Sequence, residues 1–440
     1  MTTLESLYEL YLRHPLVTTD SRDCPQGSIF FALKGDTFDG NLFAARALEQ
    51  GCAAAVVDNP EVAVDQRYMV VPSVLEALQQ LAALHRKLWG KTIIQITGTN
   101  GKTTTKELVS AVLSQSHHVL YTQGNLNNHI GVPRTLLRLT GDHDLAVVET
   151  GANHPGEIAF LCSLVHADYG LITNVGRAHL LGFGSFDGVK HTKGELYDDL
   201  SQRGGKIFLN ALDDDLREMA SSRGFQIGQQ AIPYVEARVE SCSPFLCIQW
   251  REDDDEPWHE VKTHLIGAYN IANLRAAITV GLHFGVTPSQ IDQALEAYQP
   301  TNNRSEFRQT EHNRLVVDAY NANPSSMEAA LTAFAFVEGN HKMAILGDMR
   351  ELGAESRKEH LRVLHQLQGM ELEDVWLVGS EFAQALTEKQ AESECGHAKY
   401  RTFENEKQVE DYLSAHPLSG HTILVKGSNG TGLFRLPALL

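Results

Sequence analysis

The sequence predicts an α/β protein of three domains, and three observations support this prediction. The chain has 440 residues, and at roughly 150 residues per domain this length corresponds to about three domains. Short apolar runs of strand length alternate with segments of helical periodicity. Most of these runs are continuously apolar, as in strands buried on both faces of a parallel sheet. We expect the domains to span residues 1–88, 89–300 and 301–440.

The first domain is predicted to be a small α/β unit. The runs GSIFFAL, CAAAVVD and YMVVP indicate short strands, and NLFAARALEQG indicates a helix that ends at Gly51. The next segment, SVLEALQQLAALHRKLWG, has apolar residues at helical spacing and stops at Gly90. Glycine is a common helix terminator, so a new unit is expected to begin there.

The second domain is predicted to contain a largely parallel sheet. The apolar runs TIIQI, LAVVE, YGLITN and KIFLN each end in a polar, glycine-rich or acidic loop. At residues 235–265 the continuous apolar runs give way to mixed polar and apolar residues. Antiparallel strands around an acidic turn at residues 253–256 are expected there. Adjacent acids of this kind are typical of a solvated turn rather than of a metal site.

A linker is predicted at residues 298–307, YQPTNNRSEF, because proline, asparagine and threonine lie between two periodic segments. Beyond it, RLVVDAYNANP, KMAILGDMREL, DVWLVGS and TILVKGSNGTG indicate a second α/β series. The last of these contains GSNGTG, whose glycines run in the reverse order of a dinucleotide-binding loop, so we discount that function. A Rossmann-like third domain is expected.

Composition excludes several classes of function. The formal net charge of −18 and the pI near 5.5 argue against broad binding to nucleic acid or to anionic membranes, which requires a positive face. No stretch approaches the roughly 20 apolar residues of a membrane span, and the N-terminus does not resemble a signal peptide. The six cysteines form no zinc-binding spacing. A cytoplasmic location is expected.

The stretch QITGTNGKTTTKE, residues 95–107, is typical of a phosphate-binding loop. A predicted strand leads into Gly98, Thr99, Asn100 and Gly101, and a helix is expected to begin near Thr103. Glycines allow backbone N–H groups to surround phosphate oxygens, and the helix N-terminus adds its positive dipole. Lys102 is expected to reach the β- and γ-phosphates and Thr103 to ligate Mg²⁺. Only two residues separate the glycines, whereas the commonest phosphate loop has four.

Further candidates follow the predicted strands, where ligands bind in open α/β sheets. Glu149 ends one strand, His179 lies in the loop NVGRAHLLGFG, and Asp318, Asp348 and Lys426 follow strands of the third domain. Arg304, in the linker, would reach the transferred phosphoryl group if the third domain closed over the second. Such a closure is expected to rotate about residues 298–304. Lys193 lies on a helical pattern, and the residues alone do not single it out.

The loop GTNGKTT, together with Glu149, NVGRAHL and GAYNIANLRAA, strongly resembles the Mur ligase superfamily over nearly the whole chain. These enzymes use ATP to form amide bonds in peptidoglycan and folate chemistry, and the short phosphate loop is the form they use. Four stretches, DSRDCPQGSIFFALKGDTFDGN, GNLNNHIGVP, ETGANHPGEI and DAYNANPSSMEAAL, resemble the branch that joins D-alanyl-D-alanine to UDP-N-acetylmuramoyl-tripeptide. The resemblance implies a carboxylate activated as an acyl phosphate and then attacked by an amine.

The resemblance implies a role for each domain. The first would bind the UDP substrate, the second ATP, and the third would close over ATP and bind the incoming dipeptide. It also implies two Mg²⁺ ions, held by Thr103, Glu149, His179 and a CO₂-modified Lys193, because a carbamate offers anionic oxygens that an ammonium lacks. We expect the protein to be a monomer. With Lys102 and Arg304, Glu149, His179 and Lys193 would be the catalytic residues.

The resemblance assigns the remaining site residues as follows. The ATP site would comprise Gly98, Thr99, Asn100, Gly101, Lys102, Thr103, Thr104, Asn270, Asn273, Arg304 and Asp318, the two asparagines at residues 270 and 273 contacting adenine. The UDP part would include Ser21, Arg22 and Asp39, and the muramoyl-peptide channel Asn127, Asn128 and His129. Tyr320, Asn321 and Asn323 are candidates for the dipeptide.

One departure and three alternatives remain. Many members of this branch have an arginine where this chain has Asn429, so the group that holds the dipeptide's carboxylate is open, with Arg435 as one candidate. A sibling ligase that adds a single amino acid, or a folate ligase, is the near alternative, although DSR and FDGN at the N-terminus disfavour the folate enzyme. An inactive nucleotide-binding scaffold and a P-loop motor are the alternatives from other classes.

Overall fold

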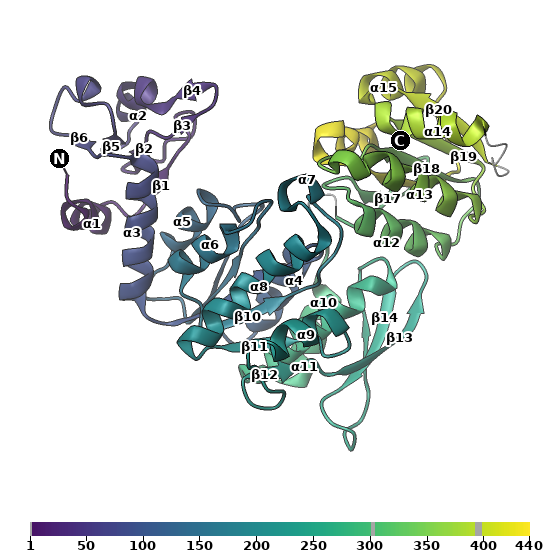
Figure 1. Ribbon diagram of the computed structural model, residues 1–440, viewed down its shortest axis with the longest axis horizontal. Coiled ribbons are helices and arrows are strands. Elements are labelled where there is room, and N and C mark those ends of the chain that lie inside the picture. The colour runs from purple at the N-terminus through teal and green to yellow at the C-terminus, as the bar shows by residue number, and fades with distance from the viewer. Residues whose placement is uncertain (1, 301–303, 392–397) are drawn as a thin grey trace.

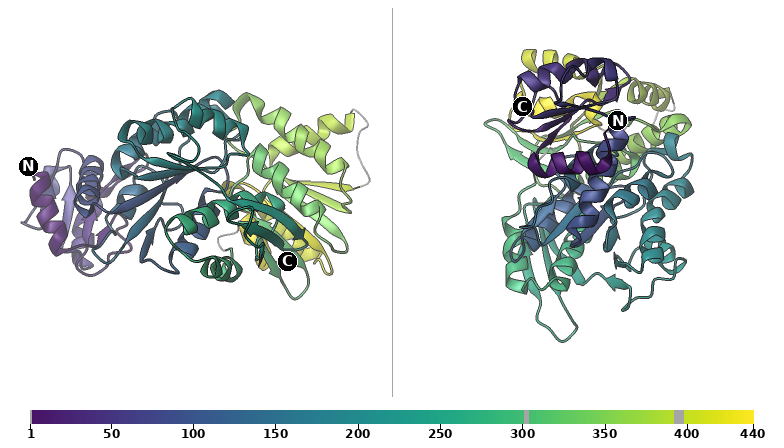
Figure 2. Two further views of the ribbon diagram at one scale, coloured as in Figure 1. Left: turned by 90° about the horizontal axis from the view of Figure 1, so that it is seen from below. Right: turned by 90° about the vertical axis from the view of Figure 1, so that its left-hand side faces the viewer.

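The computed structural model describes residues 2–300, 304–391 and 398–440, which form three α/β domains in a row (Figure 1). The N-terminal domain lies at one end, the central domain in the middle and the C-terminal domain at the other end, an order also visible after a quarter turn (Figure 2). The predicted three-domain α/β architecture with mostly parallel sheets is therefore confirmed.

The N-terminal domain is built on a four-stranded parallel sheet in the order β1-β2-β5-β6. Its strands are β1 Val17–Thr18, β2 Ile29–Phe31, β5 Ala54–Val57 and β6 Tyr68–Val70, with a small hairpin of β3 Lys34–Gly35 and β4 Phe38–Asp39. Its helices are α1 Leu4–Arg13, α2 Ala44–Glu49 and α3 Val74–Trp89, with 3₁₀ turns η1 Gly40–Phe43 and η2 Pro60–Val62. Helix α3 ends as expected at Gly90, which takes a left-handed φ of 67°.

The central domain contains a six-stranded sheet in the order β12-β11-β10-β7-β9-β8, parallel throughout as predicted. The strands are β7 Thr92–Thr97, β8 Val119–Tyr121, β9 Leu145–Glu149, β10 Tyr169–Ile172, β11 Lys206–Leu209 and β12 Ala231–Pro233. The helices are α4 Lys102–Leu113, α5 Gly131–Leu136, α6 Glu157–Val165, α7 Leu180–Phe183, α8 Phe186–Arg203 and α9 Asp214–Ser221. Isoleucine, valine and leucine of the inner strands are fully buried between helices, which explains their continuous apolarity.

A second layer of the central domain is antiparallel, as its mixed sequence predicts. Strands β13 Glu236–Cys242, β14 Leu246–Arg251 and β15 His259–Lys262 form a three-stranded sheet, and the acidic turn at residues 253–256 is exposed. The turn η3 Ala268–Asn270 leads into α10 Ile271–His283, and α11 Pro288–Ala297 follows. Helix α10 packs against α4, so this layer supports the helix that follows the phosphate loop.

The C-terminal domain has a six-stranded sheet in the order β16-β17-β21-β18-β19-β20, parallel except for the edge strand β16. The strands are β16 Glu306–Gln309, β17 Arg314–Asp318, β18 Lys342–Gly347, β19 Asp374–Val378, β20 Lys399–Phe403 and β21 Thr422–Lys426. The helices are α12 Pro324–Ala335, α13 Ser356–Gln368, α14 Ser380–Ala391 and α15 Glu406–Ala415, with 3₁₀ turns η4 Gly353–Glu355, η5 Asn429–Thr431 and η6 Leu433–Ala438. Apolar clusters fill both faces of this sheet.

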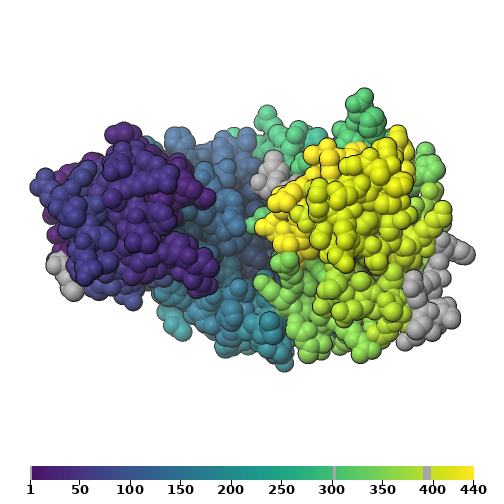
Figure 3. Space-filling model, turned by 90° about the horizontal axis from the view of Figure 1, so that it is seen from above, coloured from purple at the N-terminus to yellow at the C-terminus, as the bar shows by residue number. Residues whose placement is uncertain are grey.

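The carboxyl ends of β7, β9 and β10 face those of β17 and β21, because residues that follow each of these strands line one shared cavity. Figure 3 shows the surface hollowed between the N-terminal and C-terminal domains, with the central domain at the bottom of the hollow. The boundaries that we expect between domains stay predictions. The expected hinge at residues 298–304 includes residues 301–303, which lie outside the described residues.

Candidate active site

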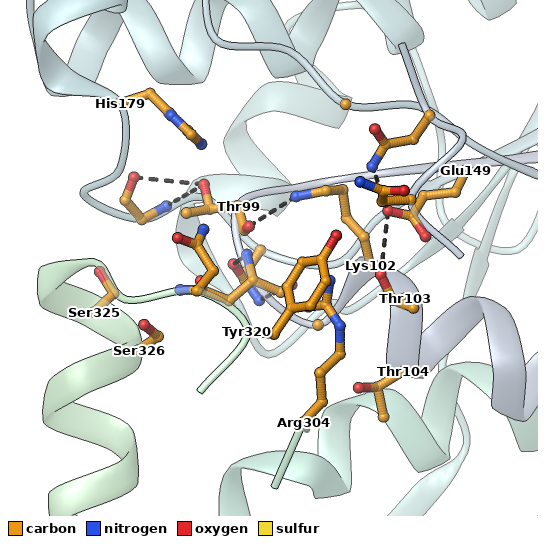
Figure 4. Close-up of a pocket in the computed structure, with 18 of the residues that line it drawn as sticks. Thr99, Lys102, Thr103, Thr104, Glu149, His179, Arg304, Tyr320, Ser325 and Ser326 are labelled. Carbon is orange, nitrogen blue, oxygen red and sulfur yellow. Dashed lines mark hydrogen bonds between the residues drawn. The ribbon is translucent and has the colours of Figure 1, made fainter. Parts of the chain in front are cut away.

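The candidate site is a cavity of about 630 Å³ between the central and C-terminal domains. Most of the predicted site residues line it, and they come from loops that are far apart in the sequence. They are Thr99, Asn100, Gly101, Lys102, Thr103, Thr104, Asn127, Asn128, His129, Glu149, His179, Asn270, Asn273, Arg304, Asp318, Tyr320 and Asn321. Figure 4 shows the phosphate loop opposite Arg304 and Tyr320. Gly98, Lys193 and Asn323 lie behind this lining.

The phosphate loop depends on two glycines that adopt positive φ. Gly98 has φ 142°, and a Cβ there would lie 2.0 Å from Thr173 Oγ1; Gly101 has φ 78° and packs on the Asn273 amide. The segment that follows β10 also holds the loop, since Asn100 N donates to Asn174 Oδ1 (3.0 Å). Helix α4 begins at Lys102, so its N-terminal N–H groups open into the cavity.

Lys102 is held above the loop by two backbone carbonyls. Its Nζ donates to Gly98 O and Thr99 O, both at 2.8 Å. Burial lowers the pKa of its amine to about 8, while the Glu149 carboxylate acts in the opposite direction. A phosphate anion in the cavity would replace these neutral acceptors with charged ones.

Thr103 and Glu149 form a pair that fits Mg²⁺. The Thr103 hydroxyl donates to Glu149 Oε1 (3.3 Å), which also accepts from Asn127 Nδ2 (2.7 Å). The second oxygen, Glu149 Oε2, is buried without a hydrogen-bond partner. Since buried polar atoms nearly always have a partner, this oxygen is suited to bind a cation. Among the residues that the structure describes, no three His, Cys, Asp or Glu side chains cluster as a metal site, so ligands would include hydroxyl and phosphate oxygens.

Lys193 is buried rather than solvated, although it lies on a helix with a polar sequence. It is 3% exposed on α8, its Nζ lies 3.4 Å from Ala152 O and 5.4 Å from the centre of the Phe183 ring, and no salt bridge reaches it among the described residues. Burial, with a smaller contribution from the Lys102 cation, lowers the pKa of the Lys193 amine to about 7. An amine that is neutral near physiological pH can react with CO₂, as the expected carbamate requires.

His179 stands at the boundary between the two domains. Its Nδ1 contacts Glu351 Oε2 of the C-terminal domain. Burial lowers the pKa of the His179 imidazole, and the Glu351 carboxylate opposes this shift. The ring points toward the loop that carries Thr99 (Figure 4).

Arg304 brings a guanidinium from the C-terminal side. It stacks on the Tyr320 ring at 3.7 Å from its centre, and its Nε is buried without a hydrogen-bond partner. Asp318 is paired with Lys426 Nζ at 2.5 Å, and Lys426 is fully buried. A guanidinium nitrogen without a partner beside a phosphate loop is suited to bind an anion.

The amides expected to contact adenine line the cavity but also support the loop. Asn270 Nδ2 donates to Ile266 O (2.8 Å), Asn273 Nδ2 donates to Asn270 Oδ1 (2.8 Å), and Asn273 Oδ1 accepts from Thr105 Oγ1 (3.0 Å). Much of their bonding capacity is therefore used within the protein. Their contact with adenine stays a prediction.

Among the substrate candidates, Asn323 has a clear structural role. It caps helix α12, and its Nδ2 donates to Asn100 Oδ1 (2.9 Å), so it joins the C-terminal domain to the phosphate loop. Asn128 accepts from the N–H groups of Ile130 and Gly131. Asn128 therefore lines the cavity in a fixed position, whereas Asn323 supports the phosphate loop without lining the cavity itself.

The predicted UDP-binding residues Ser21, Arg22 and Asp39 lie in the N-terminal domain and are not among the described residues that line this cavity. Arg22 pairs with Asp20, and Asp39 accepts from the Asn41 backbone and side chain. Arg435, the candidate for the dipeptide's carboxylate, is paired with Glu406 (2.8 Å), whereas Arg350 lies on Gly430, next to Asn429.

Sequence reasoning missed several cavity residues. Asn174 follows strand β10 and could be predicted from the strand end, whereas Ser325 could not, because its position in the cavity depends on how the two domains meet. The same holds for Glu351, which contacts His179 but does not line the cavity itself. Ser325 Oγ accepts from Arg177 N (3.0 Å) across that interface.

Comparisons with known proteins agree with this geometry. Residues 15–86 match the family described as Mur ligase family, catalytic domain; residues 96–281 match the Mur ligase middle domain; and residues 303–429 match the Mur ligase, glutamate ligase domain. The UDP-N-acetylmuramoyl-tripeptide–D-alanyl-D-alanine ligase of Escherichia coli is 37% identical over 374 residues, covering 83% of this chain and 81% of that protein. The ligase of the same name from Bacillus subtilis is 35% identical over 346 residues, covering 77% and 74%.

Solved structures show the same fold. A structure of MurF from Acinetobacter baumannii has a TM-score of 0.82 and 32% identity, covering 96% of this chain and 92% of that one. MurF from Thermotoga maritima, solved in complex with ADP, has a TM-score of 0.80 at 24% identity and covers 97% of both chains.

The three-domain fold and a phosphate loop that shares its cavity with Arg304 of the C-terminal domain are typical of a nucleotide-dependent enzyme. The chain belongs to the Mur ligase family. Over the part of the chain that the structure describes, no helix has the length and apolarity needed to cross a membrane.

Proposed function

We propose that this chain is the ATP-dependent ligase that joins D-alanyl-D-alanine to UDP-N-acetylmuramoyl-tripeptide in peptidoglycan precursor synthesis. The observation that carries the proposal is a single cavity in which the phosphate loop, the Asn127–His129 loop and Arg304 of another domain converge. The two relatives at 35–37% identity bear the name of this activity. A cytoplasmic monomer is part of the proposal.

The nucleotide would bind with its phosphates at the start of α4. The N–H groups of the loop would surround the β- and γ-phosphates. Lys102 Nζ would exchange its carbonyl acceptors for phosphate oxygens, and Arg304 would meet the γ-phosphate with its unpaired Nε. These two cations stand where negative charge builds during phosphoryl transfer.

In the first step, a carboxylate oxygen of the tripeptide attacks the γ-phosphorus, the bond to the β–γ bridging oxygen breaks, and ADP leaves. The product is an acyl phosphate, whose carbonyl carbon is more electrophilic than that of the carboxylate. In the second step, the dipeptide's amine attacks that carbon, phosphate leaves with the bonding pair, and the nitrogen loses a proton.

Mg²⁺ would be held by Thr103 Oγ1 and Glu149 Oε2, with a second ion at His179 and Lys193. When bound, these ions would neutralise phosphate charge. Lys193 contributes by reacting as a neutral amine with CO₂ to give a carbamate and a proton. Its lowered pKa supports this modification, because only the unprotonated amine has the electron pair to attack CO₂.

The test is phosphate release from ATP in the presence of Mg²⁺, with both UDP-N-acetylmuramoyl-tripeptide and D-alanyl-D-alanine supplied and then with each omitted. We expect release only when both are present. Release that needs another amine, such as a single amino acid, would move the chain to a sibling ligase. Nucleotide binding with no release under any combination would instead support the inactive scaffold.

A further inference from the structure

Two residues with an unfavourable backbone conformation meet at the interface between the central and C-terminal domains. His179 has φ 52° and Glu351 has φ 62°, both in the left-handed region. Residues other than glycine rarely adopt this region, and they keep it only where the surrounding structure imposes it. Their meeting at the cavity therefore calls for a functional explanation.

The contact between them involves both side chain and backbone. Glu351 Oε2 contacts His179 Nδ1, and Glu351 O accepts from Leu181 N at 3.2 Å. Two residues further on, Gly353 packs so closely on α7 that a Cβ would lie 3.1 Å from Leu181 Cδ1. Residues 351–353 therefore hydrogen-bond to and pack against the start of α7, directly after His179.

This contact determines which nitrogen His179 offers to the cavity. A carboxylate at Nδ1 keeps the proton on that nitrogen, so Nε2 remains an acceptor with a free lone pair. Histidines that bind metals commonly have a carboxylate partner on the other ring nitrogen, which fixes the tautomer and the ring orientation. His179 lines the cavity, and its ring is directed toward the phosphate loop (Figure 4).

We propose that Glu351 is a positioning residue that orients His179 for the second metal ion, so that this part of the site is complete only when the C-terminal domain is closed. The inference rests on the proposed function and on the assignment of His179 as a ligand. An open domain would take Glu351 away and leave the imidazole free to rotate. Closure over ATP and assembly of the metal site are then one event.

The experiment measures Mn²⁺ binding to the full-length protein by electron paramagnetic resonance, with a non-hydrolysable ATP analogue present. Glu351→Gly removes the carboxylate while tolerating the positive φ, so the thermal midpoint should not fall. Glu351→Gln keeps an oxygen that accepts from Nδ1–H. The matched control is Glu355→Ala, four residues further along, where the carboxylate pairs with Lys358 instead.

We expect Glu351→Gly to weaken one of two bound Mn²⁺ ions by about 10- to 100-fold, Glu351→Gln to weaken it less, and Glu355→Ala to match the wild type. In a His179→Ala background, Glu351→Gly should have no further effect, because both changes remove the same interaction. Unchanged Mn²⁺ binding in Glu351→Gly, an additive effect in the double variant, or a single ion in the wild type would each overturn the inference. Ligase turnover by the wild type is scored separately, so a failure of the proposed function is distinguished from these outcomes.

Discussion

Lys193 shows how far burial changes the chemistry of a single residue. Its ammonium form would be buried without a salt bridge among the described residues. Burial outweighs the opposing effect of the Glu157 and Glu195 carboxylates and lowers the pKa of the amine to about 7. An unpaired buried charge is costly enough that neutralisation is the ordinary outcome. The same burial that removes the charge makes the nitrogen a nucleophile.

We predict that Lys193→Ala abolishes most ligase activity, because the carbamate oxygens expected at the second metal ion are lost. Small carboxylic acids such as formate or acetate should restore part of it by occupying the space left by the side chain. The measurement is the rate of phosphate release with increasing acid. Lys190→Ala is the matched control, since Lys190 lies one turn earlier on α8 and pairs with Asp215 and Glu218. Full activity without added acid would remove the metal role of Lys193.

The pKa of Lys193 also predicts how stability depends on pH. Between about pH 7 and the ordinary lysine value of 10.5, the unfolded chain binds a proton at this site and the folded chain does not. Stability from this group therefore rises with pH across that window, by at most about 1.4 kcal/mol per pH unit. The variant Lys193→Met has no amine at this site. In CO₂-depleted buffer, its thermal midpoint should therefore exceed that of the wild type most near pH 7, and the difference should shrink toward pH 10. A constant difference between the two proteins would contradict the lowered pKa.

At the scale of elements, the strand-to-helix loop of residues 98–101 places the catalytic groups. Its path is set by the close approach of Gly98 to Thr173, directly after the neighbouring strand β10, and of Gly101 to Asn273 on α10. Two separate parts of the central domain therefore fix one turn. Such rigid support holds the N–H groups of the loop and Lys102 in position before the substrate binds, as electrostatic stabilisation of a transition state requires.

We predict that Gly98→Ala weakens ATP binding by at least about tenfold, because a Cβ would displace Thr173 and push the loop from β10. Titration with a fluorescent ATP analogue measures the effect. Gly204→Ala is the control: Gly204 has φ 72° at the end of α8 with open space around it. It should lower the thermal midpoint through backbone strain and leave nucleotide affinity unchanged. Equal affinity in both variants would show that the close approach does not shape the site.

The elements that could be predicted from the sequence are those with strong local signals. Long apolar runs such as β7, β9 and β18, and helices with a clear stop such as α3 at Gly90, are recognised because local pattern and tertiary burial agree. The short strands β8 and β12, three residues each, could not be predicted, because short strands at the edge of a sheet have little apolar pattern. Lys102 could be predicted from the phosphate-loop pattern and Glu149 from its place at the end of a strand.

The rest of the site depends on tertiary contacts that no local pattern encodes. Lys193 was singled out only by family resemblance, because its burial comes from packing of α8 against α6 and α7. The partner of His179 lies 172 positions away in another domain, and Arg304 lines the cavity together with residues of the distant phosphate loop.

At the scale of the whole molecule, an ion pair with a buried carboxylate joins the central and C-terminal domains. Arg177 of the central domain pairs with Glu359 on α13 at 3.3 Å, and Glu359 is 2% exposed. Its second oxygen is buried without a hydrogen-bond partner, so Arg177 is its one cationic partner among the described residues. Removing one member of a buried pair leaves an uncompensated charge, which costs about 3–5 kcal/mol. Closure and this pair are therefore coupled.

We predict that Arg177→Ala shifts the protein toward an open arrangement, because closure would then bury Glu359 without its cation. Small-angle scattering of the wild type should show a smaller radius of gyration with Mg²⁺ and an ATP analogue than without, and the variant should need more nucleotide for the same change. About half of the Arg177 side chain is exposed to water, which screens the ion pair. We therefore expect the nucleotide concentration needed for closure to rise by about tenfold, less than the loss of a fully buried pair would cause. Arg217→Ala, which breaks an exposed pair with Asp214 within one helix, is the control and should follow the wild type. Identical scattering of the free and nucleotide-bound wild type would refute closure itself, and a nucleotide requirement unchanged in Arg177→Ala would refute its dependence on this pair.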